Sequence, residues 1–205
     1  LGIPQNAPVV GTAVRFVEEK GLPYLFDAMP RVLAAAPDAY LLLVGDGPLR
    51  DALAQQAATL GYSGRVIFAG FQADPRPYLS LMNAFVLPVP FGSASIGLLE
   101  AMAMRRAVII TFGGKGEAVI DGETGLCPPP RDPQALGEAI LRVILHPEFE
   151  RQLGANARRR IEQSFSSRSA ATQLLALYQK ALGSTNHADY RSSQTSLVGV
   201  QQEHL

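Results

Sequence analysis

Two basic residues lie in one short segment between an apolar run and a helix-like pattern. Arg15 and Lys20 follow the run Pro8–Val14 and precede Leu22, which begins a series of apolar residues at helical spacing. Two cations beside the N-terminus of a helix form a binding site for an anion such as phosphate, because the helix dipole and its unpaired N–H groups also attract negative charge. The alternative interpretation is that both residues are solvated surface charges.

A carboxylate occurs in a similarly unusual place. Glu100 lies within the apolar segment Ile96–Met104, and a charge among apolar residues needs a partner. That partner is either a ligand or a structural group of the protein, such as an arginine or a backbone N–H. The small residues Gly92–Ser95 stand directly before this segment, where the N–H groups of a helix start are open to a phosphate.

Two glycine-rich loops follow other apolar runs. Gly45–Pro48 allows close approach of a ligand to the backbone, although the same sequence is typical of an ordinary turn. Gly113–Glu117 combines three glycines with a cation, which suits either a phosphate or sugar site or a flexible loop. It lacks the Walker spacing, and the Gly-x-Gly-x-x-Gly dinucleotide fingerprint is absent, so a nicotinamide-dependent enzyme is only a minor alternative.

Short apolar runs alternate with segments of helical periodicity along most of the chain. This alternation predicts an α/β fold, a Rossmann-like parallel sheet of six strands with helices on both faces. Ligands bind beyond the carboxyl ends of the strands in such a sheet, and each segment described above follows a predicted strand. The predicted strands are residues 8–14, 39–44, 65–68, 84–87, 108–110 and 125–127, and the main helices are 22–36, 48–60, 96–104, 132–144, 147–163 and 167–182.

Composition and charge exclude several classes of protein. The 205 residues include 18 basic and 18 acidic side chains, so nothing indicates a nucleic-acid binder. A single cysteine, Cys127, rules out an internal disulfide. No apolar run reaches the roughly 18 residues of a membrane-spanning helix, and the N-terminus lacks the features of a signal peptide. We therefore expect a cytoplasmic domain. We also expect the chain to be a fragment, because the sequence does not begin with Met.

Taken together and in order, five stretches resemble the C-terminal domain of the group 1 glycosyltransferases (glycosyltransferase family 4), whose two-lobed architecture is termed GT-B. The resemblance spans roughly residues 8–180, and the order and spacing of its motifs are specific for the fold and the family. The five stretches are Gly11–Gly21, Leu43–Pro48, Arg65–Gly70, Leu99–Ala103 and Gly113–Leu126.

The resemblance implies roles for individual residues. Arg15 and Lys20 are the catalytic residues that it implies, since both would bind the pyrophosphate of the donor and stabilise the charge of the departing nucleoside diphosphate. Glu100 would accept hydrogen bonds from the ribose hydroxyl groups. The other donor-binding residues that it implies are Gly70 and Phe71 beside the nucleobase, Ser95 and Ile96 at the distal phosphate, and Gly92 at the transferred sugar.

For the whole protein, the resemblance implies a retaining glycosyltransferase that moves a hexose from a UDP- or GDP-sugar to a glycan or lipid acceptor. It implies no further cofactor and no metal, and the sequence contains no Asp-x-Asp motif. Residues 1–7 are expected to be a hinge remnant, 8–182 the nucleotide-sugar-binding domain and 183–205 a polar tail. An N-terminal domain missing from this chain would bind the acceptor, so the fragment alone should be inactive; the full-length protein is a candidate for peripheral membrane association.

Position 92 is the main departure from the family pattern. The family has two glutamates separated by seven residues; the second is Glu100, but Gly92 replaces the first, which contacts the transferred sugar in the family. The spacing from Pro88 to Glu100 is intact, so the difference is a substitution. Val14 and Arg105 also stand where glycine is usual. The alternative function is therefore that of a degenerate, non-catalytic homologue that serves as a binding or scaffold module.

Overall fold

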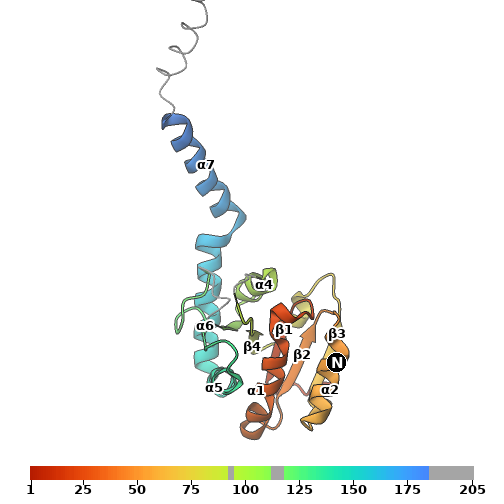
Figure 1. Ribbon diagram of the computed structural model, residues 1–205. Coiled ribbons are helices and arrows are strands. Elements are labelled where there is room, and N and C mark those ends of the chain that lie inside the picture. The colour runs from red at the N-terminus through yellow and green to blue at the C-terminus, as the bar shows by residue number, and fades with distance from the viewer. Residues whose placement is uncertain (92–94, 112–117, 185–205) are drawn as a thin grey trace, which may run out of the picture. The chain divides into compact units, whose positions relative to one another are not determined.

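The fold is built on a parallel sheet whose strands are short and apolar. The computed structural model describes residues 1–91, 95–111 and 118–184. The strands pair in the order β3-β2-β1-β4-β5 and all run parallel (Figure 1). Successive residues of a strand point to opposite faces, and every residue of β4 is buried, so helices cover both faces and the predicted α/β class is confirmed. The strands are β1 (Val9–Ala13), β2 (Tyr40–Val44), β3 (Val66–Gly70), β4 (Ala84–Leu87) and β5 (Ala107–Ile110).

The sheet has five strands in the described part of the chain, and the prediction of a sixth at 125–127 is wrong. Leu126 forms only an isolated parallel bridge beside β5, in which its N–H donates to the carbonyl of Val108 and its carbonyl accepts from the N–H of Ile110, both at 2.9 Å. Residues 128–130 are three prolines, which have no N–H to donate to a ladder. The pairing therefore stops after one bridge.

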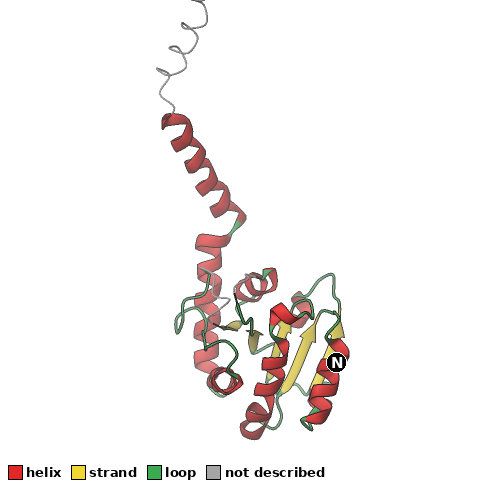
Figure 2. Cartoon of the chain, in the orientation of Figure 1, coloured by secondary structure: helices red, strands yellow, loops and turns green. Residues whose placement is uncertain are grey.

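Helices α1 to α6 flank the sheet (Figure 2). Helix α1 packs along α5, while α4 and α6 pack against β5. Helix α5 begins as its sequence predicts, because Oδ1 of Asp132 accepts a hydrogen bond from the N–H of Ala135 at 2.9 Å and Pro133 occupies the first turn. The α-helices are α1 (Leu22–Ala35), α2 (Arg50–Thr59), α3 (Arg76–Leu79), α4 (Ile96–Ala103), α5 (Pro133–Ile144), α6 (Pro147–Arg160) and α7 (Ser167–Ser184), and the shorter turns are η1 (Glu18–Lys20), η2 (Ser63–Arg65) and η4 (Ile161–Phe165).

The chain divides into two compact units, Leu1–Gln163 and Ser164–Leu205. The first unit holds the sheet with α1 to α6. The second contains α7, and each helix in the described part of the chain is too short or too polar to traverse a lipid bilayer. The boundaries predicted at residues 7 and 182 stay predictions. Large exposed apolar side chains on α7 are those of Leu174, Leu175, Leu177, Tyr178 and Leu182.

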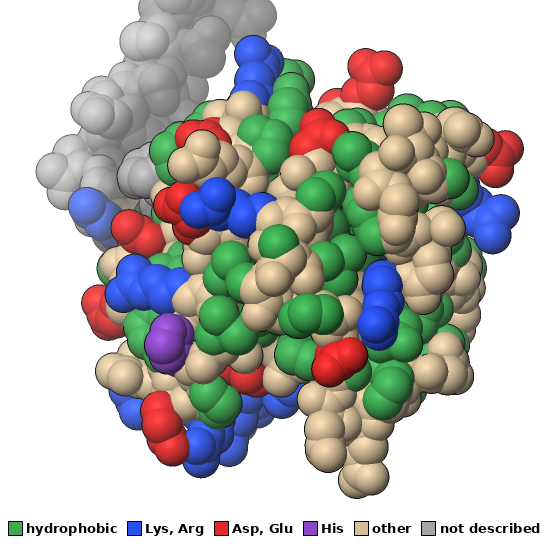
Figure 3. Space-filling model, turned by 90° about the horizontal axis from the view of Figure 1, so that it is seen from below, with side chains coloured by type: hydrophobic (Ala, Val, Ile, Leu, Met, Phe, Trp, Pro, Cys, Tyr) green, Lys and Arg blue, Asp and Glu red, His purple; other side chains and the backbone are tan. Residues whose placement is uncertain are grey.

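Charged side chains of both signs share the face of the molecule that Figure 3 shows. On the face in Figure 3, basic and acidic side chains are interspersed, as the equal totals of 18 allow. A surface ion pair such as Arg31–Glu138, with 2.9 Å between Nη2 and Oε1, contributes little to stability because water screens it. The stability of the sheet therefore comes mainly from apolar burial.

Two buried threonines differ in whether their hydroxyl group is hydrogen-bonded. Thr12 of β1 is fully buried, and its Oγ1 has no partner among the described residues, whereas the hydroxyl of buried Thr111 donates to the carbonyl of Val89. Thr12→Val should therefore raise the free energy of unfolding by about 1 kcal/mol, and Thr111→Val should lower it by about 1 kcal/mol. Urea denaturation measures both changes. A loss of stability in Thr12→Val would contradict the unsatisfied state of its hydroxyl.

Candidate functional site

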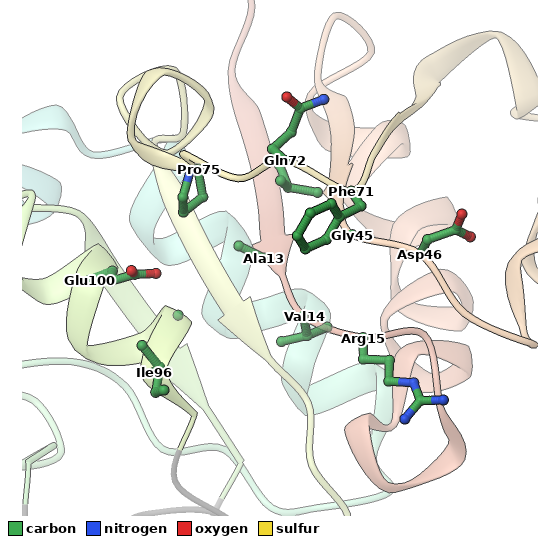
Figure 4. Close-up of a pocket in the computed structure, with 12 residues that line it drawn as sticks. Ala13, Val14, Arg15, Gly45, Asp46, Phe71, Gln72, Pro75, Ile96 and Glu100 are labelled. Carbon is green, nitrogen blue, oxygen red and sulfur yellow. The ribbon is translucent and has the colours of Figure 1, made fainter.

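A cavity of about 420 Å³ lies where the carboxyl ends of three strands meet the start of α4. Its volume is in the range typical of small-molecule sites. The sheet order places β1 between β2 and β4. The chain continues to one side of the sheet after β1 and to the other side after β4, which makes the gap between β1 and β4 a topological switch point. Open α/β sheets bind ligands at such a point. The lining residues are Ala13, Val14, Arg15, Val44, Gly45, Asp46, Phe71, Gln72, Pro75, Ile96, Gly97 and Glu100 (Figure 4).

The segment that leaves β1 continues to pair with β2 beyond the end of the strand. The N–H of Val14 donates to the carbonyl of Val44 at 3.0 Å, and the N–H of Phe16 donates to that of Asp46 at 2.9 Å. Val14 and Phe16 are both buried, and the ring of Phe16 packs edge-on against that of Phe68 at 6.2 Å between centroids. Arg15 stands between these two anchored residues, is exposed, and lines the cavity.

Glycines allow the neighbouring loops to touch this segment backbone to backbone. A Cβ atom at Gly45 would lie 2.0 Å from the carbonyl oxygen of Val14, and one at Gly97 would lie 2.4 Å from that of Ala13. Gly45 also has a φ of 130°, which other residues rarely adopt. The exit of β1 is therefore held between the β2 loop on one side and the first turn of α4 on the other.

Helix α4 supplies two features of the cavity. Ile96 and Gly97 line it, so the first turn of the helix faces it; the N–H groups of Leu98 and Leu99 donate to the carbonyl of Ser95, at 3.0 and 3.4 Å. One turn further on, the half-buried Glu100 extends its carboxylate into the cavity (Figure 4), while Ala101 and Met102 pack into the core. Glu100 is thus kept at the surface of the cavity by its buried neighbours.

The loop after β3 forms a further wall. Phe71 is 77% exposed at the rim, and Nε2 of Gln72 donates to the carbonyl of Ala69 at 2.8 Å, which fixes the start of the loop. Pro75 lines the cavity at the far end of the loop and lies near Glu100 in Figure 4. This wall places an aromatic ring and an aliphatic ring beside the space that Arg15 and Glu100 also line.

The structure brings together some of the residues predicted from the sequence. Arg15, Glu100, Phe71 and Ile96 line one cavity. Lys20 lies half-buried at the end of η1 and is not among the lining residues.

The remaining predicted residues lie beside the cavity or beyond the described part of the chain. Gly70 and Ser95 each precede a lining residue, and Gly92 and the whole loop Gly113–Glu117 lie outside the described residues. Gln72 and Pro75 also line the cavity, and the sequence pattern did not predict them. The only feature of the sequence that points to them is their position in the loop after a strand.

The arrangement combines an exposed cation and a helix N-terminus with a separate carboxylate. The cation and the helix dipole attract an anion, and an ionised carboxylate accepts hydrogen bonds from hydroxyl groups. Among the residues that the structure describes, no three His, Cys, Asp or Glu side chains come together as metal ligands would.

Comparison with known proteins gives a consistent result. The model of the family described as "Glycosyl transferases group 1" matches residues 7–146. The lipopolysaccharide core biosynthesis glycosyltransferase LpsE of Rhizobium meliloti (strain 1021) is 36% identical over 180 residues, which cover 86% of this chain and 52% of that protein. The chain spans about half the length of the curated relatives that it matches.

Solved structures share the fold. The C-terminal domain of a group 1 family glycosyl transferase (LpcC) from Francisella tularensis superposes with a TM-score of 0.71 at 23% identity, covering 80% of this chain and 90% of that one. Alr3699/HepE of Anabaena in complex with UDP gives a TM-score of 0.79 at 26% identity, covering 85% of this chain and 49% of that one. The same protein has been solved with UDP-glucose.

Replacement of Gly97 tests the backbone contact between α4 and β1. Gly97→Ala should lower the free energy of unfolding by about 1–3 kcal/mol, because its Cβ would lie 2.4 Å from the Ala13 carbonyl and the helix must shift. Gly64→Ala is the control, since a Cβ at that position meets nothing within 4 Å. Its free energy of unfolding should equal that of the unmodified chain. Urea denaturation compares the two, and equal stability of both variants would show that the contact at Gly97 is unimportant.

Proposed function

Since the chain belongs to the group 1 glycosyltransferases, we propose that it is the donor-binding half of an enzyme that transfers a hexose from a nucleoside diphosphate sugar. The observation that carries this proposal is the shared cavity of Arg15, Glu100 and the first turn of α4 at the carboxyl ends of the strands. A nucleoside diphosphate has an anionic part and a hydroxyl-bearing ribose, which match these two kinds of group.

Arg15 and the start of α4 bind the diphosphate in this proposal. As the bond to the sugar breaks, negative charge develops on the departing diphosphate, and a preorganised guanidinium and helix dipole stabilise that charge. Lys20, five residues after Arg15, is assigned to the same diphosphate as a second cation. Because these groups meet the charge of the leaving group, we propose a transfer that needs no metal ion. We propose retention of the anomeric configuration because the resemblance to the family implies it.

Glu100 and the β3 loop bind the nucleoside. The carboxylate of Glu100 accepts hydrogen bonds from the ribose hydroxyl groups, and the nucleobase lies against the backbone at Gly70 and Phe71. Phe71 is 77% exposed at the rim of the cavity, and an exposed aromatic ring gains by covering the face of a base. The crystallisation of Alr3699/HepE with UDP supports a uridine nucleotide as the first ligand to test.

The acceptor site belongs to the other half of the protein in this proposal, because the chain spans about half the length of its relatives. The acceptor is a glycan or a lipid-linked glycan, as the name of the LpsE relative suggests for that protein. A degenerate homologue is the second candidate, favoured by Gly92 at the position where the family pattern has glutamate. Turnover of any nucleotide sugar by the full-length protein would eliminate that candidate.

Calorimetric titration of the chain with UDP and with GDP tests the proposal directly. Binding of at least one of them with a dissociation constant below about 1 mM is expected, since a charge-assisted diphosphate contact adds to the burial of the base. Circular dichroism establishes that the sample is folded. A folded chain that binds neither nucleotide at millimolar concentration would refute the proposed function.

Truncation of Arg15 separates the phosphate contact from the nucleoside contact. Arg15→Ala should weaken UDP binding by about 1.5–3 kcal/mol, roughly 10- to 150-fold, and leave uridine binding nearly unchanged, because the guanidinium meets only the diphosphate. Arg159→Ala removes an exposed cation on α6 and serves as the matched control. Equal losses for UDP and uridine would mean that Arg15 does not contact phosphate.

A further inference from the structure

We infer that Arg76 is a positioning residue that fixes the Phe71–Pro75 wall of the cavity and couples it to Glu100. This inference rests on the proposed function, since it assigns a role in nucleoside binding. Arg76 is the first residue of α3 and is not among the residues that line the cavity. It acts through Asp74 and Pro75, the two residues that precede it, and through its charge.

Arg76 and Asp74 hold each other in a two-pronged ion pair. Nε of Arg76 donates to Oδ1 of Asp74 at 2.7 Å, and Nη2 donates to Oδ2 at 2.8 Å. The backbone N–H of Arg76 also donates to Oδ1 at 3.1 Å. The planar fork of a guanidinium matches both oxygens of a carboxylate at once, which lysine does not. Pro75, which lines the cavity, is therefore held between two residues that are locked together.

The wall is thus fixed near both ends. Gln72 bonds to the carbonyl of Ala69 at the β3 end, and the Asp74–Arg76 pair closes the other end. Phe71 lies at the start of this loop and is 77% exposed. Fixing a loop before the ligand arrives removes the entropic cost of ordering it on binding. The pair therefore favours binding of the nucleoside, which the loop contacts, and not of the phosphates.

The charge of Arg76 also reaches Glu100. The pKa of the Arg76 guanidinium lies above its usual value, chiefly through hydrogen bonding and attraction to Asp74 and in part through attraction to Glu100. Figure 4 shows the carboxylate of Glu100 extending beneath Pro75, the residue next to Arg76. Pro75 and Glu100 line the same cavity, so a wall that Arg76 holds in place stays beside the carboxylate that would meet the ribose of a nucleoside packed on this loop.

The opposing interpretation is an ordinary surface ion pair that has no effect on the cavity. The side chains of Arg76 and Asp74 are 71% and 48% exposed, and exposed pairs often contribute nothing measurable to stability. The two interpretations differ in ligand binding and not in folding. Arg151–Glu148 on α6 is a matched control, because it is also an exposed ion pair between residues close in the sequence. Neither residue lines the cavity.

Titration of uridine and UDP into the chain and its variants tests the inference. Arg76→Gln and Asp74→Asn should each weaken both ligands by the same factor, about three- to fivefold, with unchanged thermal unfolding, and Arg151→Gln should have no effect. When Glu100 is replaced by Gln, Arg76→Gln should reduce the affinity for uridine and UDP by less than it does in the unmodified chain. The carboxylate that Arg76 attracts is then absent. Arg76→Lys should keep the attraction to Glu100, because the charge remains. It should lose the affinity that depends on the two-pronged bond to Asp74, which lysine cannot form.

Failure of the inference is distinct from failure of the proposed function. If the unmodified chain binds neither UDP nor uridine, both are overturned. If it binds UDP and the Arg76 and Asp74 variants bind as tightly, the inference alone is overturned. Equal losses from Arg76→Gln with and without Glu100→Gln would likewise overturn the coupling, and a loss confined to UDP would assign Arg76 to the phosphates instead.

Discussion

The close backbone contact around the end of β1 is the constraint on which the site depends. Gly45 and Gly97 approach the carbonyl oxygens of Val14 and Ala13 from two sides, at distances that no side chain permits. This contact brings the β2 loop and α4 together around Arg15. If either glycine carried a side chain, the loop or the helix would have to shift, and the walls that Arg15 and Glu100 line would shift with it.

The site that results divides its tasks between elements. The exit of β1 supplies the positive charge of Arg15, the first turn of α4 supplies the positive end of a helix dipole, and the next turn of α4 supplies the carboxylate of Glu100. The loop after β3 supplies rings and little polarity. Each element is anchored by the buried sheet beneath it, so the ligand-binding groups need little rearrangement to act together. The proposed assignments concern the nucleotide, and Gly92 and residues 112–117 lie outside the described part of the chain.

The fold was largely predictable, because buried parallel strands are continuous apolar runs and their loops fall at one edge. For the same reason Arg15 and Glu100 could be assigned to one site although they lie far apart in the sequence. The strand predicted at 125–127 was wrong because periodicity does not register the three prolines that follow it. The wall formed by Gln72, Pro75 and the Asp74–Arg76 pair was not predictable, since loop conformation depends on contacts that a sequence pattern does not encode.

The central claim is that Arg15 and Glu100 bind different parts of one nucleoside diphosphate. A crystal structure of the chain with UDP tests it most directly. The diphosphate is expected within hydrogen-bonding distance of the Arg15 guanidinium, the ribose hydroxyl groups on the Glu100 carboxylate, and the uracil beside Phe71. UDP bound elsewhere, or in this cavity with neither side chain in contact, would contradict it.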